Sequence, residues 1–129
     1  MAPFTIVDGK NEWGVIVNNN VVPVMNGKPN YRTVPDIEER DEICAIMVPR
    51  YVLDNFKTAK EAVEYIRDYV AIYPHDMLLK SDYEQHYIIS DKKSTYLLEI
   101  IDNKVVVIDM TAGSNSTLAG KPYMTNFHL

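Results

Sequence analysis

The sequence predicts an α+β protein in which two helices cover one face of an antiparallel sheet. In the second half of the chain, short segments rich in β-branched residues alternate with turn residues, a pattern typical of an antiparallel meander. In the middle, one segment repeats its apolar residues at helical spacing behind an N-terminal cap. The chain has 129 residues, enough for one hydrophobic core, so we expect a single domain over 1–129.

The first half of the chain predicts one strand, one loop and one helix. Residues 14–22, GVIVNNNVV, are rich in β-branched residues and end before Pro23, which predicts a strand. Glycine and proline make 25–36 a loop. The acidic run DIEERDE then favours a helix over 38–55, because carboxylates stabilise the positive end of a helix dipole. Pro49 is expected to bend this helix or to divide it in two.

The clearest predicted element is a helix over 59–72. Thr58 and Glu61 have the spacing of a capping box, in which each side chain satisfies a free backbone N–H of the other residue. Pro74 ends the element. The apolar residues that recur at helical spacing are Ala59, Ala62, Val63, Ile66, Val70 and Tyr73. This apolar stripe predicts that the helix packs against a sheet.

The last part of the chain predicts strands joined by short turns. Strands are expected over 86–90, 95–101 and 104–110, separated by the turn sequences DKKS and DN. A loop rich in glycine, serine and asparagine follows over 111–122, and a final short strand, YMTNF, over 123–127. These elements form the antiparallel meander of the predicted sheet.

Composition excludes several classes of partner. The formal net charge is −5 and no basic cluster is present, which argues against nucleic-acid binding. No run of 18 apolar residues occurs, so no membrane span is expected. The start of the chain lacks the pattern of a secretory signal, and the single cysteine, Cys44, permits no intramolecular disulfide. We therefore expect a cytoplasmic protein.

Cys44 is a candidate nucleophile, with His75, His86 or His128 as a base. Its neighbours EICAIMV are mostly apolar, however, so a buried structural cysteine on the predicted helix is favoured. The histidines show no metal-binding spacing, and no glycine-rich phosphate loop is present. The sequence therefore predicts neither a metal nor a cofactor.

Asparagines at two places could carry chemistry: Asn18, Asn19 and Asn20 in the first strand, and Asn126 in the last. A side-chain amide is a neutral donor that can stabilise negative charge developing on an oxygen atom. Two such amides at two strand ends could converge on one carbonyl group. Local sequence alone favours a simpler explanation, in which Asn19 and Asn20 form a bulge and Asn126 caps a strand end.

Four quoted segments carry a family resemblance, in order along the chain. They are VDGKNEWGVIVNNNVVP, VPRYVLDNFKTAKEAVEYI, HYIISDKKSTYLLEIIDNKVVVID and YMTNF. The first resembles the DGMNE-x-G strand signature of the linear amide C–N hydrolases, the choloylglycine hydrolase and penicillin V acylase group. The second is similar to the helix pair of that family, the third to its H-x-x-I-D … V-E … L-x-V strands, and the last to its LTNSP stretch.

The resemblance implies part of the four-layer αββα fold of N-terminal-nucleophile hydrolases. Members of this family hydrolyse linear amides, such as acyl-amino acids or bile-salt conjugates, through an acyl-enzyme on an N-terminal cysteine whose own amino group is the base. Two asparagines supply oxyanion and positioning contacts. Asn126 matches the second of these, and the first falls at Asn20 or one residue later, at Val21. Asn11 and Glu12 match the turn of the signature and are expected to be structural.

This sequence departs from the family pattern at the nucleophile. No segment matches the N-terminal cysteine, arginine and aspartate of the family, and Cys44 lies where the family has no nucleophile. We therefore expect a middle fragment of an amidase that acts on a small-molecule amide and is inactive alone. A bare sheet face would favour a homo-oligomer or assembly with the missing part of the fold. The alternatives are a non-catalytic α+β binding or assembly module and a hydrolase using Cys44 with a histidine.

Overall fold

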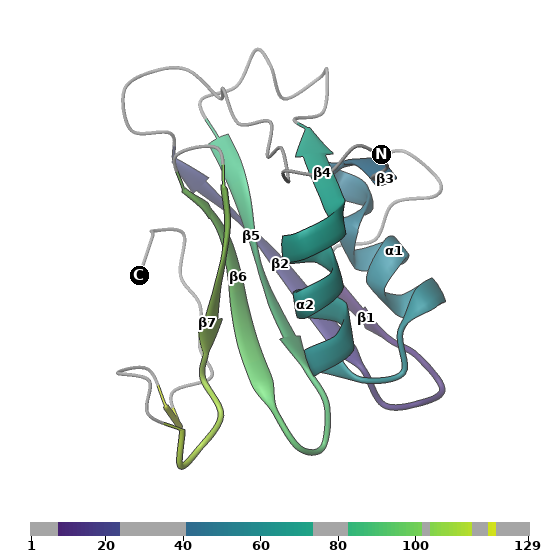
Figure 1. Ribbon diagram of the computed structural model, residues 1–129, viewed down its shortest axis with the longest axis vertical. Coiled ribbons are helices and arrows are strands. Elements are labelled where there is room, and N and C mark those ends of the chain that lie inside the picture. Colours follow the sequence, from purple (N-terminus) through teal and green to yellow (C-terminus); the bar gives the residue numbers. More distant parts are fainter. Residues whose placement is uncertain (1–7, 24–40, 74–82, 102–103, 115–118, 121–129) are drawn as a thin grey trace.

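A computed structural model describes residues 8–23, 41–73, 83–101, 104–114 and 119–120. They form a five-stranded antiparallel sheet with the order β1-β2-β5-β6-β7 and a two-stranded parallel sheet, β3-β4. Helices α1 (Val48–Asn55) and α2 (Ala59–Tyr69) lie on one face of the larger sheet (Figure 1). The predicted α+β class, an antiparallel sheet with two helices on one face, is confirmed.

The larger sheet confirms the predicted meander. Its strands are β1 (Asp8–Lys10), β2 (Ile16–Pro23), β5 (Tyr83–Ser90), β6 (Thr95–Ile101) and β7 (Lys104–Asp109). The pairing of β2 with β5 runs without interruption through the asparagine triplet, with Asn18, Asn19 and Asn20 opposite Ile88, Tyr87 and His86. The bulge expected at Asn19 and Asn20 is therefore wrong. The loop expected over 25–36 and the strand expected over 123–127 lie outside the described residues.

The helix predicted over 38–55 is wrong in its described first half. Residues Asp41–Cys44 form strand β3, a 3₁₀ turn covers Ala45–Met47, and α1 begins only at Val48. Pro49 lies in the first turn of α1, where its missing N–H would have no helical partner in any case. The proline therefore starts the helix and does not bend it.

The helix predicted over 59–72 is confirmed as far as Tyr69. Thr58 Oγ1 accepts a hydrogen bond from the Glu61 N–H at 3.2 Å, as the capping box predicts. The following residues, Val70–Tyr73, form strand β4, which pairs in parallel with β3. Their apolar residues continued the helical spacing, but pairing with a distant strand determines their conformation.

The two faces of the larger sheet carry different sets of buried side chains. On the helix face, the core includes Val15, Val17, Tyr87, Ile89, Leu98 and Ile100 from the strands, and Val48, Val52, Ala62, Val63 and Ile66 from the helices. On the other face, called here the second face, Ile88, Leu97 and Met110 form a smaller apolar cluster. His86 and Glu99 are also fully buried there. Side chains alternate between the two faces along each strand.

Two polar side chains tie the turns at one end of the sheet to the helices. Asn11 Nδ2 donates to the carbonyl oxygens of Leu53 (3.2 Å) and Phe56 (2.7 Å), at the C-terminal end of α1. Asn11 Oδ1 accepts from the N–H groups of Trp13 and Val15, both at 3.0 Å. The amide thus uses both ends to fix the β1–β2 turn against the helix layer. The structural role expected of Asn11 is confirmed.

Asp91, in the β5–β6 turn, also connects its turn to a helix, at the start of α2. Its carboxylate accepts from the Ala59 N–H at 2.8 Å, and from the N–H groups of Lys93 (2.8 Å) and Ser94 (2.9 Å) in its own turn. Partial burial by itself would raise the pKa of Asp91. The backbone hydrogen bonds from Ala59, Lys93 and Ser94 outweigh this effect and hold the pKa below its usual value.

Candidate functional site

Three polar residues from three neighbouring strands lie side by side on the second face, and we call them the polar row: Asn20, His86 and Glu99. Asn20 on β2 is the direct cross-strand partner of His86 on β5. His86 Nδ1 lies 3.2 Å from Glu99 Oε1 on β6. Both His86 and Glu99 are 0% exposed, so this contact is shielded from solvent.

The alternation of side chains explains why the sequence places these residues on the second face. Tyr87 and Leu98 contribute to the core beneath the helices, so their neighbours His86 and Glu99 point to the other side of the sheet. On β2, Val17 contributes to the same core. Asn20, three positions farther along the strand, therefore faces away from the helices.

The asparagine triplet is divided between the two faces. Asn19 lies on the helix side, opposite Tyr87, whereas Asn18 and Asn20 lie on the second face. Asn18 is exposed and lies between Asp8 on β1 and the apolar Ile88 on β5. Asn20 is half-buried and its partner is His86. Of the three, Asn20 is therefore the asparagine whose neighbour on the second face is a buried titratable side chain.

The polar row contains a hydrogen bond between two buried titratable side chains. His86 Nδ1 and Glu99 Oε1 share one hydrogen in this contact. His86 Nε2 is also buried, and it has no hydrogen-bond partner among the residues that the structure describes. The row therefore places a side-chain amide next to a buried imidazole on the second face.

Of the polar row, the sequence indicated Asn20 as a candidate site residue but not the two residues beside it. Asn20 was a candidate site residue, His86 was considered as a base for Cys44 and as a metal ligand, and Glu99 was not singled out. The signal for Glu99 was available, since a carboxylate in the apolar run TYLLEII is unusual and needs a partner when buried. The other predicted site residue, Asn126, lies outside the described part of the chain.

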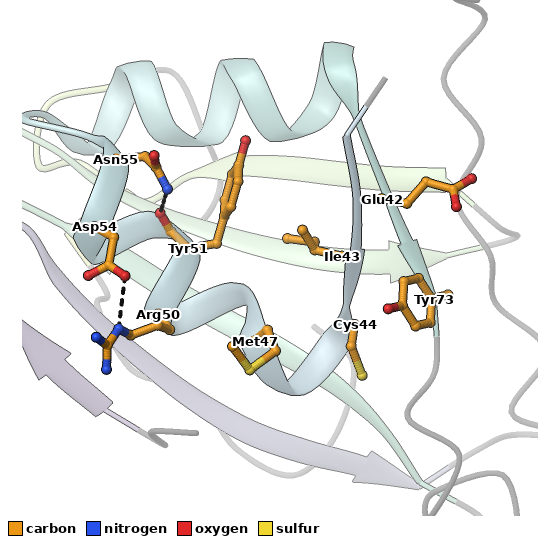
Figure 2. A pocket seen from close by; sticks show the side chains of 9 residues that line it. All are labelled: Glu42, Ile43, Cys44, Met47, Arg50, Tyr51, Asp54, Asn55 and Tyr73. Atoms are coloured by element: carbon orange, nitrogen blue, oxygen red, sulfur yellow. Dashed lines mark hydrogen bonds and ion pairs between the residues drawn. The ribbon is translucent and has the colours of Figure 1, made fainter. Parts of the chain in front are cut away.

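A second candidate site is a pocket of about 330 Å³ between β3 and α1 (Figure 2). Its lining residues are Glu42, Ile43, Cys44, Met47, Arg50, Tyr51, Asp54, Asn55 and Tyr73. Arg50 is committed to an ion pair with Asp54, with Nε and Oδ2 2.8 Å apart. Figure 2 shows this pair at one end of the pocket and Cys44 near Tyr73 at the other.

Cys44 was predicted to lie on a helix, but it lies on β3, where it is partly exposed. The nine lining residues of its pocket include no histidine. His86 contacts Glu99 on the second face of the other sheet and does not line this pocket. Within the described residues, the structure therefore brings no imidazole base to Cys44.

Tyr51 is the titratable group of the pocket whose pKa is displaced. Its hydroxyl donates to Asp41 Oδ2 at 3.0 Å. Burial, together with the hydrogen bond to the neighbouring Asp41 carboxylate, raises the pKa of the Tyr51 phenol above its usual range. The phenol therefore stays protonated at neutral pH and cannot act as a base there.

In the described part of the chain, no group of three or more histidine, cysteine, aspartate or glutamate side chains could hold a metal ion. No helix within the same ranges is long and apolar enough to cross a membrane.

Comparisons with known proteins agree with the sheet and helix arrangement. Two solved structures of conjugated bile acid hydrolase from Clostridium perfringens, both engineered variants, match with a TM-score of 0.60 and 25% sequence identity. Each match covers 81% of this chain but 31% of the enzyme, so the chain spans less than a third of the length of these relatives. No curated protein sequence matches significantly. The family model of the linear amide C–N hydrolases, choloylglycine hydrolase family, matches residues 1–122. Since this match covers nearly the whole chain, the protein belongs to the choloylglycine hydrolase family of linear amide C–N hydrolases.

Proposed function

We propose that this chain supplies the oxyanion-binding sheet of a cysteine amidase, with Asn20 and Asn126 as the amide donors. The substrate class is a linear amide of the bile-salt-conjugate or acyl-amino-acid type. Family membership and the likeness to bile acid hydrolases support the reaction class. The observation that carries the assignment of Asn20 is its position in a regular strand on the second face, beside the buried His86.

The chemistry of amide hydrolysis explains what an asparagine would do there. Attack of a thiolate on the amide carbon moves the carbonyl electron pair onto oxygen, and the tetrahedral intermediate then expels the amine and leaves an acyl-enzyme. Water hydrolyses the thioester and releases the acid. Donors held in place beside the oxygen stabilise its negative charge, and one such donor contributes about 3 kcal/mol.

We also propose that the attacking thiol is not Cys44. This residue is the single cysteine of the sequence, and it lies on β3 in the pocket beside α1. The polar row is built on the second face of the larger sheet, from β2, β5 and β6. The 129 residues are accordingly expected to act as a middle part of the enzyme and to hydrolyse no amide at an enzyme-like rate by themselves.

The test compares the 129-residue chain with the product of the complete reading frame that encodes it. Release of the free amino acid from a glycine-conjugated bile salt and from an N-acyl amino acid is measured for both. We expect turnover only by the complete product, and an Asn20→Ala variant should lower its kcat by about 10²- to 10³-fold. Asn18→Ala, on the same strand and face, is the matched control and should leave kcat within about twofold.

Two results would overturn the proposal. If the complete product releases no amine from either substrate, the amidase assignment is wrong and a non-catalytic binding or assembly module is favoured. If the 129 residues alone turn over substrate and Cys44→Ser abolishes this activity, Cys44 is the nucleophile.

A further inference from the structure

Four aromatic side chains form a continuous row beside helix α2, and we call them the aromatic row: Tyr51, Phe56, Tyr65 and Tyr69. In this order, the centroids of consecutive rings lie 5.8, 5.6 and 5.1 Å apart. Tyr65 is 38% exposed and Tyr69 is 48% exposed. Since tyrosine is enriched at the energetically important positions of protein interfaces, these two open rings indicate a surface that contacts a partner.

The packing of α2 does not account for its two exposed tyrosines. The residues that α2 buries against the sheet are Ala59, Ala62, Val63 and Ile66. Tyr65 and Tyr69 are one helical turn apart, so they neighbour each other on a side of the helix that this buried stripe does not include. Their rings therefore lie outside the core beneath the helix.

A carboxylate, that of Asp41 on β3, lies at the aromatic row. Asp41 Oδ2 accepts hydrogen bonds from the hydroxyl groups of Tyr51 at 3.0 Å and Tyr65 at 3.5 Å. The pairing of β3 with β4 also places Asp41 opposite Val70, the residue that follows Tyr69. A carboxylate accepts about four hydrogen bonds, and these two use Oδ2 alone. Oδ1 of this exposed side chain can therefore accept hydrogen bonds from a partner.

The charges around the aromatic row favour a cationic partner. Arg67 on α2 is held by the adjacent Asp68, with nitrogen–oxygen distances of 2.9 and 3.2 Å. Glu61 and Glu64 are exposed on the same helix, and Lys60 is the opposing charge. The whole chain has a formal net charge of −5. A cation that approaches Asp41 is therefore attracted by the surrounding field, and an anion is repelled.

A guanidinium group matches both the rings and the carboxylate. It is planar and stacks on the face of an aromatic ring, where its positive charge is attracted by the π electrons. Its N–H groups can donate two parallel hydrogen bonds to one carboxylate. A lysine ammonium group is a point charge and lacks the planar fork, so arginine is the better match.

The extent of the aromatic row indicates a polypeptide partner. Four rings at spacings of 5–6 Å exceed the size of one guanidinium group, whereas an extended chain advances about 3.3 Å per residue. Tyr51 also lines the pocket of about 330 Å³ between β3 and α1, together with the apolar Ile43 and Met47 (Figure 2). The pocket is thus continuous with the row and has room for an apolar side chain of the same segment.

We propose that the aromatic row and Asp41 form a docking site for an arginine-containing segment of a partner polypeptide. One guanidinium group stacks on Tyr69 and donates to Asp41 Oδ1, and an apolar side chain of the segment enters the pocket beside Tyr51. The docking site does not depend on the proposed amidase function, because it shares no residue with the polar row.

The first test titrates the unmodified 129-residue chain, labelled with ¹⁵N, with the peptide Leu-Arg-Arg-Arg capped at both ends. We expect saturable shifts of the backbone amide signals of Asp41, Tyr65 and Tyr69, and none at Trp13 in the β1–β2 turn. Citrulline in place of arginine keeps the shape but removes the charge and should weaken binding at least tenfold. Lysine in place of arginine should weaken it by about threefold, and alanine in place of leucine by about three- to tenfold.

Several outcomes of this titration would overturn the proposal. The absence of saturable shifts at the aromatic row excludes a docking site for this peptide. Equal binding of the citrulline or the lysine peptide shows that the guanidinium group is not recognised. If capped arginine alone binds as tightly as the peptide, the site takes a small molecule and not a polypeptide. The comparison needs no variant, so it decides the question even where a variant fails to fold.

The second test uses variants of the docking site. Asp41→Asn keeps an oxygen acceptor for the two tyrosine hydroxyls but removes the charge, and it should weaken binding of the arginine peptide by about tenfold. Tyr69→Leu removes the most exposed ring of the row and should weaken binding by about threefold. Glu12→Gln, which removes an exposed carboxylate in the β1–β2 turn, is the matched control and should change binding by less than about twofold. An equal effect of Glu12→Gln and Asp41→Asn would show non-specific attraction by the net charge and would contradict the docking site.

Discussion

Two asparagines of the same hairpin, Asn11 and Asn20, show how differently one residue type can be used in this protein. The Asn11 amide donates to two carbonyl oxygens and accepts from two N–H groups, all of them backbone groups. Its orientation is fully determined by the turn and by the end of α1. Asn20 lies on β2, half-buried, beside His86, whose Nε2 is buried and lacks a partner among the described residues. A side chain with every hydrogen bond used stabilises the fold, and one beside an unsatisfied atom is a candidate for binding.

The largest expected effect on stability lies in the polar row. Glu99→Ala should lower the free energy of unfolding by about 3–5 kcal/mol, because it removes one partner of a fully buried pair and leaves the other without compensation. The double variant His86→Leu with Glu99→Leu should regain most of this loss, since apolar residues of similar volume can replace a buried pair. Urea unfolding of both variants measures the difference. If the single substitution costs less than about 1 kcal/mol, the pair is not buried as described.

A smaller loss of stability is expected from substitution of Asn11 in the β1–β2 turn. Asn11→Ala removes four hydrogen bonds to backbone groups and should cost about 2–3 kcal/mol, the larger part of it at the part-buried carbonyl groups of Leu53 and Phe56. Asn11→Asp keeps the acceptor for Trp13 and Val15 but loses both donors, so it should fall between Asn11→Ala and the unmodified chain. Thermal unfolding ranks the three proteins. An alanine variant as stable as the unmodified chain would contradict the structural role of this asparagine.

The smallest effect on stability is expected at Asp91, and it should depend on pH. Its pKa is lowered in the folded protein from an unfolded value of about 3.9. Its stabilising contribution is therefore fully present above pH 4–5 and is lost as the pH falls through the lower folded value. Asp91→Asn should cost about 1 kcal/mol at pH 7 and should flatten the loss of stability below about pH 5.

Denaturant unfolding at several pH values measures this difference. Asp54→Asn, at an exposed ion pair with Arg50, is the control and should change stability by less than about 0.5 kcal/mol. If Asp91→Asn and the unmodified chain lose stability in parallel as the pH falls, Asp91 does not contribute to the pH dependence.

The elements that could be predicted are those whose signals are local. The cap at Thr58 and the apolar stripe behind it predicted the start of α2, and the turn sequences predicted the β5–β6–β7 meander. The parallel pair β3-β4 was missed, because its two strands are separated by α1 and α2 and neither has an alternating pattern. Val70 and Tyr73 even continued the helical spacing of α2, and only pairing with β3 makes them a strand.

The candidate site, like the fold, could be predicted from the sequence only in part. The four quoted segments were sufficient to indicate the family that the comparisons confirm. The sequence favoured a bulge at Asn19 and Asn20, however, and only the uninterrupted pairing of β2 with β5 places Asn18 and Asn20 on one face and Asn19 on the other. The neighbours of Asn20 could not be found in this way, because they depend on the register between strands that are more than 60 residues apart in the chain. A shift of one residue would have placed Tyr87, and not His86, beside Asn20. The polar row therefore exists only in the folded sheet, where long-range pairing brings an amide, an imidazole and a carboxylate together.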